Sequence, residues 1–164
     1  YGNYEVKIIA KGAGYEAGIS DIKTATLTDP TVSYIEVAAQ TFTFSEMGYS
    51  NGAEVSTVSG TTNCSIVFNK GTNSNTPKYY TTGTAVRAYG GNTITVTASK
   101  DYQISTIKLS FGSGDGSNEI TANSGEYKDG VWTGKINNGG SVVFTIEGTS
   151  GHRRISAIAI NPAE

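Results

Sequence analysis

Three tyrosines and an arginine lie close together in a stretch that otherwise consists mainly of threonine, glycine and small apolar residues. They are Tyr79, Tyr80, Arg87 and Tyr89, within NTPKYYTTGTAVRAYGGNTITV (75–96). Tyrosine rings offer rigid apolar area with a polar tip, and ligand sites combine such area with a few convergent polar groups. Stacking of a sugar ring on tyrosine, with hydrogen bonds from arginine, is the chemistry that these residue types could perform.

The residues around Gly90 and Gly91 predict how this stretch folds. In a hairpin with a two-residue loop, Arg87 would pair with Ile94 and place a charge among aliphatic side chains. A three-residue loop (90–92) separates apolar from polar residues, and such a division usually sets the register. We therefore predict the three-residue loop. It gives an apolar face of Val86, Ala88, Ile94 and Val96, and a wet face of Arg87, Tyr89, Thr93, Thr95 and Thr97.

A second aromatic pair flanks a predicted two-residue turn in GEYKDGVWTGKI (125–136). Asp129-Gly130 suits such a turn, which places Tyr127 opposite Trp132 on one face. Trp132 shares its parity with Ile136, which favours the core, and a ligand-facing position is the alternative. The residues predicted to bind a ligand are Tyr79, Tyr80, Arg87, Tyr89, Tyr127 and Trp132.

Residues that could form a catalytic centre are sparse. The only histidine is His152, and no Gly-x-Ser-x-Gly motif accompanies it, so a serine triad is not indicated. Glycoside hydrolysis needs two carboxylates about 5 to 10 Å apart, and the sequence marks no such pair among its 14 acidic residues. The one cysteine, Cys64, shares a strand face with Ile66 and Phe68 and is interpreted as a small buried hydrophobe. We predict that the protein is not an enzyme.

The glycine-rich loop GSGDGSNE (112–119) offers Asp115, Asn118 and Glu119, and calcium prefers such oxygen ligands. The loop lacks the Asp-x-Asp-x-Asp-Gly spacing. We therefore expect a solvated turn and no cofactor, with a structural calcium ion as the alternative. One histidine and one cysteine are too few for an ordinary zinc site.

Arg153 and Arg154 are adjacent in a predicted strand, so their side chains point to opposite faces. At most one can face the core, where it would need a carboxylate partner, and the other is expected to be solvated. As an anion site the pair is a weak signal.

From about residue 40 the chain consists of short runs rich in β-branched residues, separated by clusters of Gly, Asn and Ser. No segment shows a convincing helical period. Nine strands are predicted: TFTFSE (41–46), AEVSTV (53–58), CSIVFN (64–69), TAVRAY (84–89), TITVTA (93–98), ISTIKLSF (104–111), VWTGKI (131–136), SVVFTIEG (141–148) and RRISAIAI (153–160). The pattern predicts an all-β, two-sheet antiparallel β-sandwich of jelly-roll type. The last strand is expected to pair near the first.

The first 36 residues are predicted to form an extra N-terminal β-hairpin and a linker, which leaves residues 37–164 for the sandwich. YEVKIIAK (4–11) and IKTATL (22–27) alternate on either side of a loop, and Asp29-Pro30 marks the linker. With its tyrosine-led first strand and threonine-rich last strand, the hairpin resembles the end of a fibronectin type III domain.

The composition argues against two kinds of partner. Charged residues make up 16% and the net charge is −2, unlike a basic nucleic-acid-binding surface. No apolar run is long enough to span a membrane.

Three phrases carry a further resemblance: PKYYTTGTAVRAYGGNTITV (77–96), GTSGHRRISAIAI (148–160) and FSEMGYSNGAEVSTV (44–58). They resemble a β-sandwich module of secreted and surface proteins from gut-dwelling anaerobic bacteria, often found behind fibronectin-like domains and attached to hydrolases. The resemblance implies an extracellular or cell-surface accessory module, with a polysaccharide as ligand and a neighbouring domain of the parent protein as a further partner. The alternative is a structural or adhesive spacer, or a protein-binding sandwich, without a glycan ligand.

Overall fold

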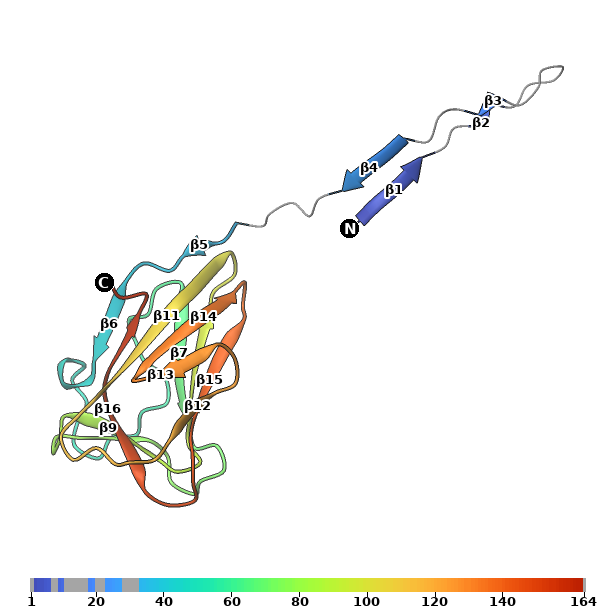
Figure 1. Cartoon of the computed structure of the whole chain (residues 1–164). Helices are drawn as coiled ribbons and strands as arrows, with labels where there is room; N and C mark the ends of the chain where they lie inside the picture. The colour runs from blue at the N-terminus through green and yellow to red at the C-terminus, as the bar shows by residue number, and fades with distance from the viewer. Residues whose placement is uncertain (1, 7–8, 11–17, 20–22, 28–32, 164) are drawn as a thin grey trace. The chain divides into compact units, whose positions relative to one another are not determined.

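The structure, a computed structural model, describes residues 2–6, 9–10, 18–19, 23–27 and 33–163 (Figure 1). The chain divides into two compact units, residues 1–33 and 34–164. The predicted division lay after residue 36. The short strand β5 (Ile35–Glu36) pairs with β11 (Tyr102–Phe111), so it belongs to the second unit.

In the first unit, β1 (Gly2–Val6) pairs with β4 (Lys23–Leu27) in antiparallel orientation. A shorter pair joins β2 (Ile9–Ala10) to β3 (Gly18–Ile19). The predicted strand over 22–27 agrees with β4 over the described residues 23–27. The predicted strand over 4–11 corresponds to two strands, β1 and β2. The predicted linker at Asp29-Pro30 and most of the loop before β4 lie outside the described residues.

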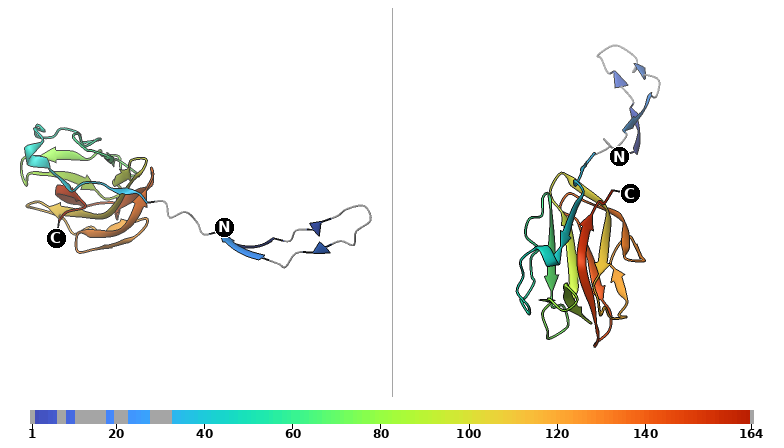
Figure 2. Two further views of the ribbon diagram at one scale, coloured as in Figure 1. Left: turned by 90° about the horizontal axis from the view of Figure 1, so that it is seen from above. Right: turned by 90° about the vertical axis from the view of Figure 1, so that its left-hand side faces the viewer.

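The second unit is a β-sandwich of two antiparallel sheets packed against each other, as predicted (Figure 2). The smaller sheet has the order β12-β15-β10-β7. The larger sheet has the order β13-β14-β11-β16-β9-β8, and it also holds β5 on β11 and β6 on β16. Within this order, only the short β5 is parallel to its neighbour. The strands are β6 (Gln40–Thr43), β7 (Cys64–Asn69), β8 (Lys78–Tyr80), β9 (Ala85–Tyr89), β10 (Thr93–Ala98), β12 (Ile120–Ala122), β13 (Glu126–Lys128), β14 (Val131–Asn137), β15 (Ser141–Ile146) and β16 (His152–Ile160).

Alternation along the strands builds one core between the sheets, because successive side chains point to opposite faces. In β10, Ile94, Val96 and Ala98 are buried while the threonines between them are half-buried on the outer face. Cys64 is buried with Ile66 and Phe68 on β7, as predicted. The larger sheet contributes, among others, Val86, Ala88, Ile104, Ile107, Leu109, Trp132, Ile155, Ile158 and Ile160.

One side of the sandwich is closed by the segment that precedes β7. The Gly52 amide donates to the Tyr79 carbonyl at 2.7 Å, and the Phe68 amide donates to the Ser56 carbonyl at 2.7 Å. This segment therefore bridges the edge strands β8 and β7 of the two sheets. The predicted strand over 53–58 is present only as two isolated bridges, Glu54 with Lys78 and Thr57 with Val67. The predicted strand over 41–46 corresponds to β6 followed by a short 3-10 helix (Phe44–Glu46).

The predicted hairpin between residues 84 and 98 is wrong. β9 pairs with β16 and β8 in the larger sheet, whereas β10 pairs with β15 and β7 in the smaller one. The 90–92 loop therefore crosses from one sheet to the other, so Thr93, Thr95 and Thr97 lie on the opposite outer face of the sandwich from Arg87 and Tyr89. The apolar residues that we assigned to the core are nonetheless buried, because both strands pack inward against the same core.

Other predictions about strand pairing are confirmed. The last strand, β16, pairs with β6, the strand that follows the short β5 at the start of the second unit. The Asp129-Gly130 turn has both residues at positive φ, and Tyr127 pairs with Trp132 across it. Positive φ at both central residues is the geometry of the tight turn that Asp-Gly favours.

Candidate functional site

Three of the six predicted ligand-binding residues lie together on the outer face of the larger sheet. The Tyr80 and Tyr89 hydroxyls are 3.4 Å apart, and the Arg87 guanidinium lies 5.3 Å from the centre of the Tyr80 ring. All three side chains are half-buried. We call Tyr80, Arg87 and Tyr89 the aromatic–arginine face.

The local sequence explains why these side chains meet. β8 and β9 pair in antiparallel register, with Tyr79 opposite Val86 and Tyr80 opposite Ala85. Tyr79 and Val86 point into the core, so their neighbours Tyr80 and Arg87 must point outward. The segment after Pro77 looks loop-like in the sequence, but Tyr80 lies on a strand, and this position brings its ring over Arg87.

The environment raises the pKa of Tyr89. Burial is the main cause, and the neighbouring Tyr80 hydroxyl acts in the same direction, while Arg87 offsets part of the effect. The Tyr89 phenol therefore stays protonated at neutral pH and can donate a hydrogen bond as well as accept one.

Burial removes two of the predicted residues from the site. Trp132 is 0% exposed and its indole Nε1 donates to the Ser124 carbonyl at 2.6 Å. Tyr79 is 4% exposed and packs in the core, with its ring 5.9 Å from that of Tyr49. Neither ring offers a face on which a ligand could stack.

Tyr127 is also separate from the aromatic–arginine face. It lies on β13, at the opposite edge of the larger sheet from β8. Its ring packs edge-on against Phe144, with centroids 5.5 Å apart. Burial raises the pKa of Tyr127 to about 12, and Arg153 opposes part of that rise. This environment is that of a packing residue at the rim of the core.

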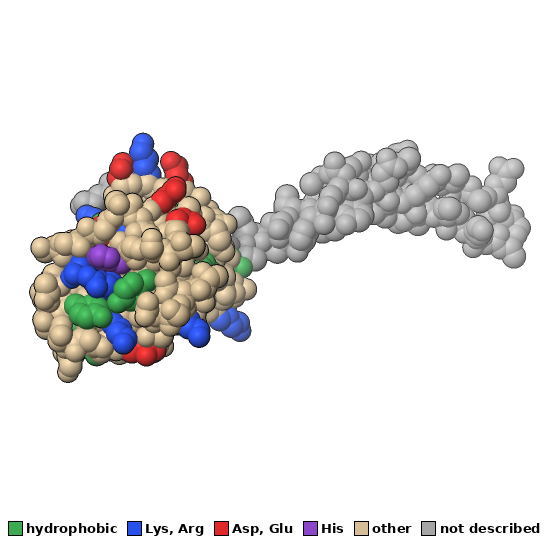
Figure 3. Space-filling model, turned by 90° about the horizontal axis from the view of Figure 1, so that it is seen from below, with side chains coloured by type: hydrophobic (Ala, Val, Ile, Leu, Met, Phe, Trp, Pro, Cys, Tyr) green, Lys and Arg blue, Asp and Glu red, His purple; other side chains and the backbone are tan. Residues whose placement is uncertain are grey.

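Alternation in the sequence did not place Lys78, Arg154 and His152 on this face. Across three neighbouring strands, Lys78 pairs with Arg87 and Arg87 pairs with Arg154, so their side chains form one row. His152 pairs with Tyr89 in the next row, and its Nε2 lies 3.3 Å from the Gly114 carbonyl. Figure 3 shows basic and apolar or aromatic side chains gathered beside the histidine. The missing information was the pairing of β9 with β16, which sequence alternation alone does not specify.

Arg153 and Arg154 point to opposite faces, as predicted. Arg154 was expected to be solvated and is only 8% exposed. The Arg153 guanidinium binds the Asp115 carboxylate at 2.7 Å, donates to the Asn118 carbonyl at 2.9 Å and lies 4.0 Å from the Phe111 ring centre. Its carboxylate partner is the one that an arginine facing the core would need.

These contacts also engage the loop considered for calcium. The Asp115 carboxylate accepts hydrogen bonds from Arg153 and from the Arg154 amide, and the Asn118 amide group donates to two carbonyls in the 147–150 loop. Among the described residues, no cluster of three His, Cys, Asp or Glu side chains could hold a metal ion.

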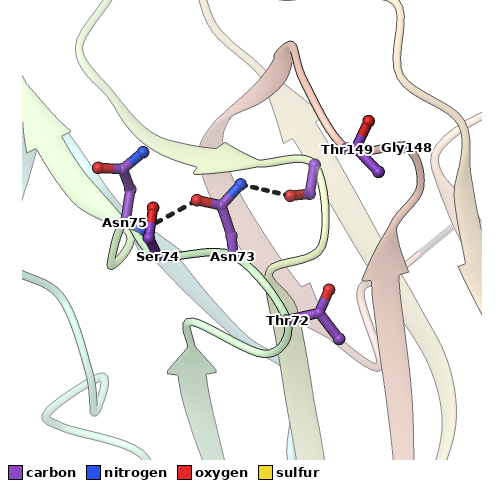
Figure 4. Close-up of a pocket in the computed structure, with 7 residues that line it drawn as sticks. Thr72, Asn73, Ser74, Asn75, Gly148 and Thr149 are labelled. Carbon is purple, nitrogen blue, oxygen red and sulfur yellow. Dashed lines mark hydrogen bonds between the residues drawn. The ribbon is translucent and has the colours of Figure 1, made fainter.

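A polar groove of about 410 Å³ lies at the end of β9, where Gly90 in its wall directly follows Tyr89. Asn73 donates to the Gly90 carbonyl at 2.6 Å and accepts from the Asn75 amide at 2.8 Å, as Figure 4 shows. The other walls of the groove come from the loops before β8 and before β16. The lining residues are Thr72, Asn73, Ser74, Asn75, Gly90, Gly148 and Thr149.

Asn92 joins the groove to the face. It is fully buried. Its side-chain oxygen Oδ1 accepts from the backbone amide of Tyr89 at 2.7 Å, and its Nδ2 donates to the backbone carbonyls of Lys70 at 2.8 Å and Asn75 at 3.0 Å. A buried amide that satisfies several backbone groups fixes the loops that contact it. The end of β9 and the 70–75 loop are therefore held in one arrangement.

Comparison with protein-family models, curated proteins and solved structures found no match for the chain. In the described part of the chain, no helix has the length and apolar character needed to cross a membrane.

Proposed function

We propose that the sandwich is a non-catalytic module that binds a polysaccharide on the aromatic–arginine face, in a secreted or cell-surface protein. The observation that carries the proposal is the half-buried pair Tyr80 and Tyr89, with hydroxyls 3.4 Å apart and Arg87 stacked on one ring. Tyrosine rings stack on the apolar faces of sugar rings, and a hydroxyl that shares one hydrogen bond still has capacity for another.

The adjoining groove supports an extended ligand. Its walls carry side-chain amides and hydroxyls, together with backbone groups at Gly90 and Gly148. These groups donate and accept hydrogen bonds in the way that sugar hydroxyls do. A chain of sugars stacked on the tyrosines could continue into this groove.

The resemblance of residues 44–58, 77–96 and 148–160 to accessory modules of gut bacterial surface proteins supports the same proposal. Two of these segments form the strands around the proposed site. Residues 77–96 contain β8 and β9, which carry the aromatic–arginine face, and residues 148–160 contain the neighbouring strand β16. The proposed location outside the cell rests on this resemblance.

Affinity electrophoresis of the chain through gels containing plant and host polysaccharides tests the proposal. We expect at least one polysaccharide to retard the protein. Substituting Tyr80→Ala or Tyr89→Ala should weaken its binding about tenfold, which corresponds to the loss of one good stacking contact. If no polysaccharide in a broad panel retards the protein, the proposed function is wrong.

Tyr34→Ala is the matched control. Tyr34 is also half-buried, but it directly precedes β5, which pairs with the start of β11 at the other end of the sandwich from Gly90. Its substitution should leave retardation unchanged. Equal losses in Tyr34→Ala and Tyr89→Ala would show that the affinity does not depend on the proposed face.

A further inference from the structure

The row Lys78, Arg87 and Arg154 concentrates positive charge on the face proposed to bind glycan. Side chains that pair directly across antiparallel strands are close neighbours, and like charges in such positions destabilise a sheet. Within the described residues, the one ion pair joins Arg153 to Asp115, so no carboxylate neutralises any member of this row. Glu54, opposite Lys78 at the sheet edge, forms no ion pair with it.

The two arginines are also partly removed from water. Arg154 is 8% exposed, and both its Nε and that of Arg87 are buried without a hydrogen-bond partner among the described residues. Arg154 donates through Nη1 to the Thr82 carbonyl, and Gly83 and Gly114 lie against its side chain. A carbonyl is only a partial substitute for a carboxylate, because it carries no net charge.

A desolvated, unneutralised guanidinium is costly for folding. A buried polar group without a partner calls for an explanation, and a binding site for the missing charge is one. The Asp115 carboxylate nearby does not supply this charge, since Arg153 and the Arg154 amide engage both of its oxygens. Solvent reaches the half-buried Lys78 and Arg87 but hardly reaches Arg154, so this part of the face carries a net positive charge that a ligand can complete.

We propose that the ligand of this face is an acidic polysaccharide, whose carboxylate or sulfate groups bind beside Arg87, Arg154 and Lys78 while a sugar ring stacks on Tyr80 or Tyr89. This inference rests on the proposed glycan-binding function and narrows it to a substrate class. Arginine suits both kinds of anion, because its planar fork of N–H donors matches their paired oxygens. Arg87 is the direct contact, since its side chain is half-buried and stacked beside the tyrosines.

Titration calorimetry of the full chain with three sets of polysaccharides tests the inference. The first set carries uronate carboxylates (polygalacturonate, alginate), the second carries sulfate esters (chondroitin sulfate, heparin), and the third is neutral (dextran, xyloglucan). We expect binding to at least one acidic set, and the set that binds identifies the anion. Binding should weaken as salt concentration rises, because salt screens exposed charges.

The substitution Arg87→Gln should weaken binding of the acidic polysaccharide about tenfold to a hundredfold, the usual range for a lost charge-assisted hydrogen bond. Arg87→Lys keeps the positive charge but lacks the planar fork of N–H donors, so its affinity should lie between those of the unmodified chain and Arg87→Gln. Lys100→Gln is the charge-matched control, since Lys100 is exposed in the turn between β10 and β11, at the far end of β10 from Gly90. It should bind like the unmodified chain.

Two results would overturn the inference while leaving the proposed function in place. One is binding to neutral polysaccharides alone. The other is binding to an acidic polysaccharide that Arg87→Gln and Lys100→Gln weaken equally. Absence of binding to all three sets would contradict both proposals together.

Discussion

At the scale of single residues, the structure separates aromatic side chains that look alike in the sequence. Tyr79 and Tyr80 are neighbours, yet one is 4% exposed in the core and the other lies half-buried beside Arg87. Their placement follows from strand alternation once β8 is recognised as a strand. Three residues are too few to show a period, which is why the sequence alone could not say which tyrosine points outward.

Tyr127 gives a prediction for the pH dependence of stability. Its pKa is raised to about 12 in the folded chain, from 10.0 for an ordinary tyrosine, mainly because its phenol is buried. Between these values the unfolded chain loses the proton while the folded chain keeps it. The stabilisation is therefore fully present below about pH 10 and is lost as the pH rises towards about 12.

Urea denaturation at a series of alkaline pH values measures this effect. Tyr127→Phe cannot ionise, so its stability should fall less steeply above pH 10 than that of the unmodified chain. A residual slope should remain in the variant, since burial also raises the pKa of Tyr49 and Tyr89. Identical slopes for variant and parent would show that Tyr127 does not hold its proton through burial.

At the scale of elements, the loop between β9 and β10 sets the geometry of the proposed site. It carries the chain from one sheet to the other, and it holds Gly90 in the wall of the groove. The Gly91 amide donates to the Ile146 carbonyl at 2.6 Å, and the Gly90 amide donates to the Gly151 carbonyl at 3.3 Å. The loop is therefore anchored to the β15–β16 connection, whose residues line the same groove.

Gly91 is the position at which this anchoring can be tested. It has φ of +90°, and a Cβ there would lie 2.5 Å from the Thr72 hydroxyl oxygen. Gly139 has nearly the same φ, +84°, and a Cβ added there would meet no other atom within 4 Å. Both Gly→Ala variants suffer the left-handed backbone penalty of about 1 to 2 kcal/mol, and only the first adds crowding.

We expect Gly91→Ala to lower the free energy of unfolding by about 1 to 3 kcal/mol more than Gly139→Ala, the usual range for overpacking. Chemical denaturation of the two variants gives the difference directly. Equal losses would mean that the 70–75 loop moves aside without cost, and that its contact with Gly91 does not fix the groove.

Several strands and one turn could be predicted from the sequence, but the pairing of the strands could not. The strand segments 64–69 and 93–98 and the Asp129-Gly130 turn follow from alternation and turn chemistry, and the structure confirms them. Strand pairing is different, because the same alternation serves a hairpin and a crossover between sheets equally well. The outward orientation of Arg87 and Tyr89 was therefore predicted correctly, whereas the strand predicted to pair with theirs was wrong.

At the scale of the whole molecule, the sandwich presents two unlike outer faces. The smaller sheet shows a threonine-rich surface, with Thr93, Thr95 and Thr97 along β10. The larger sheet shows the aromatic–arginine face and the basic row, which have Arg87 in common. A sandwich can present different surfaces in this way because the inward residues of both sheets bear the packing, which leaves the outward residues free for binding.

The features that support the proposed function lie in one part of the sandwich. The tyrosines, the basic row and the groove are contributed by β8, β9, β16 and the loops that adjoin them. The turns at 99–101 and 138–140, at the other end of β10, contribute to none of these features. A ligand bound as proposed should therefore leave that end unaffected.

The most direct test is a magnetic-resonance titration of the isotope-labelled chain with fragments of a polysaccharide that retards it. The account predicts that the amide signals of Tyr80, Arg87, Tyr89 and the 148–151 loop shift with added fragment. The signals of the turns at 99–101 and 138–140 should stay in place. Shifts concentrated in those turns, or along the outer face of β10, would contradict the account.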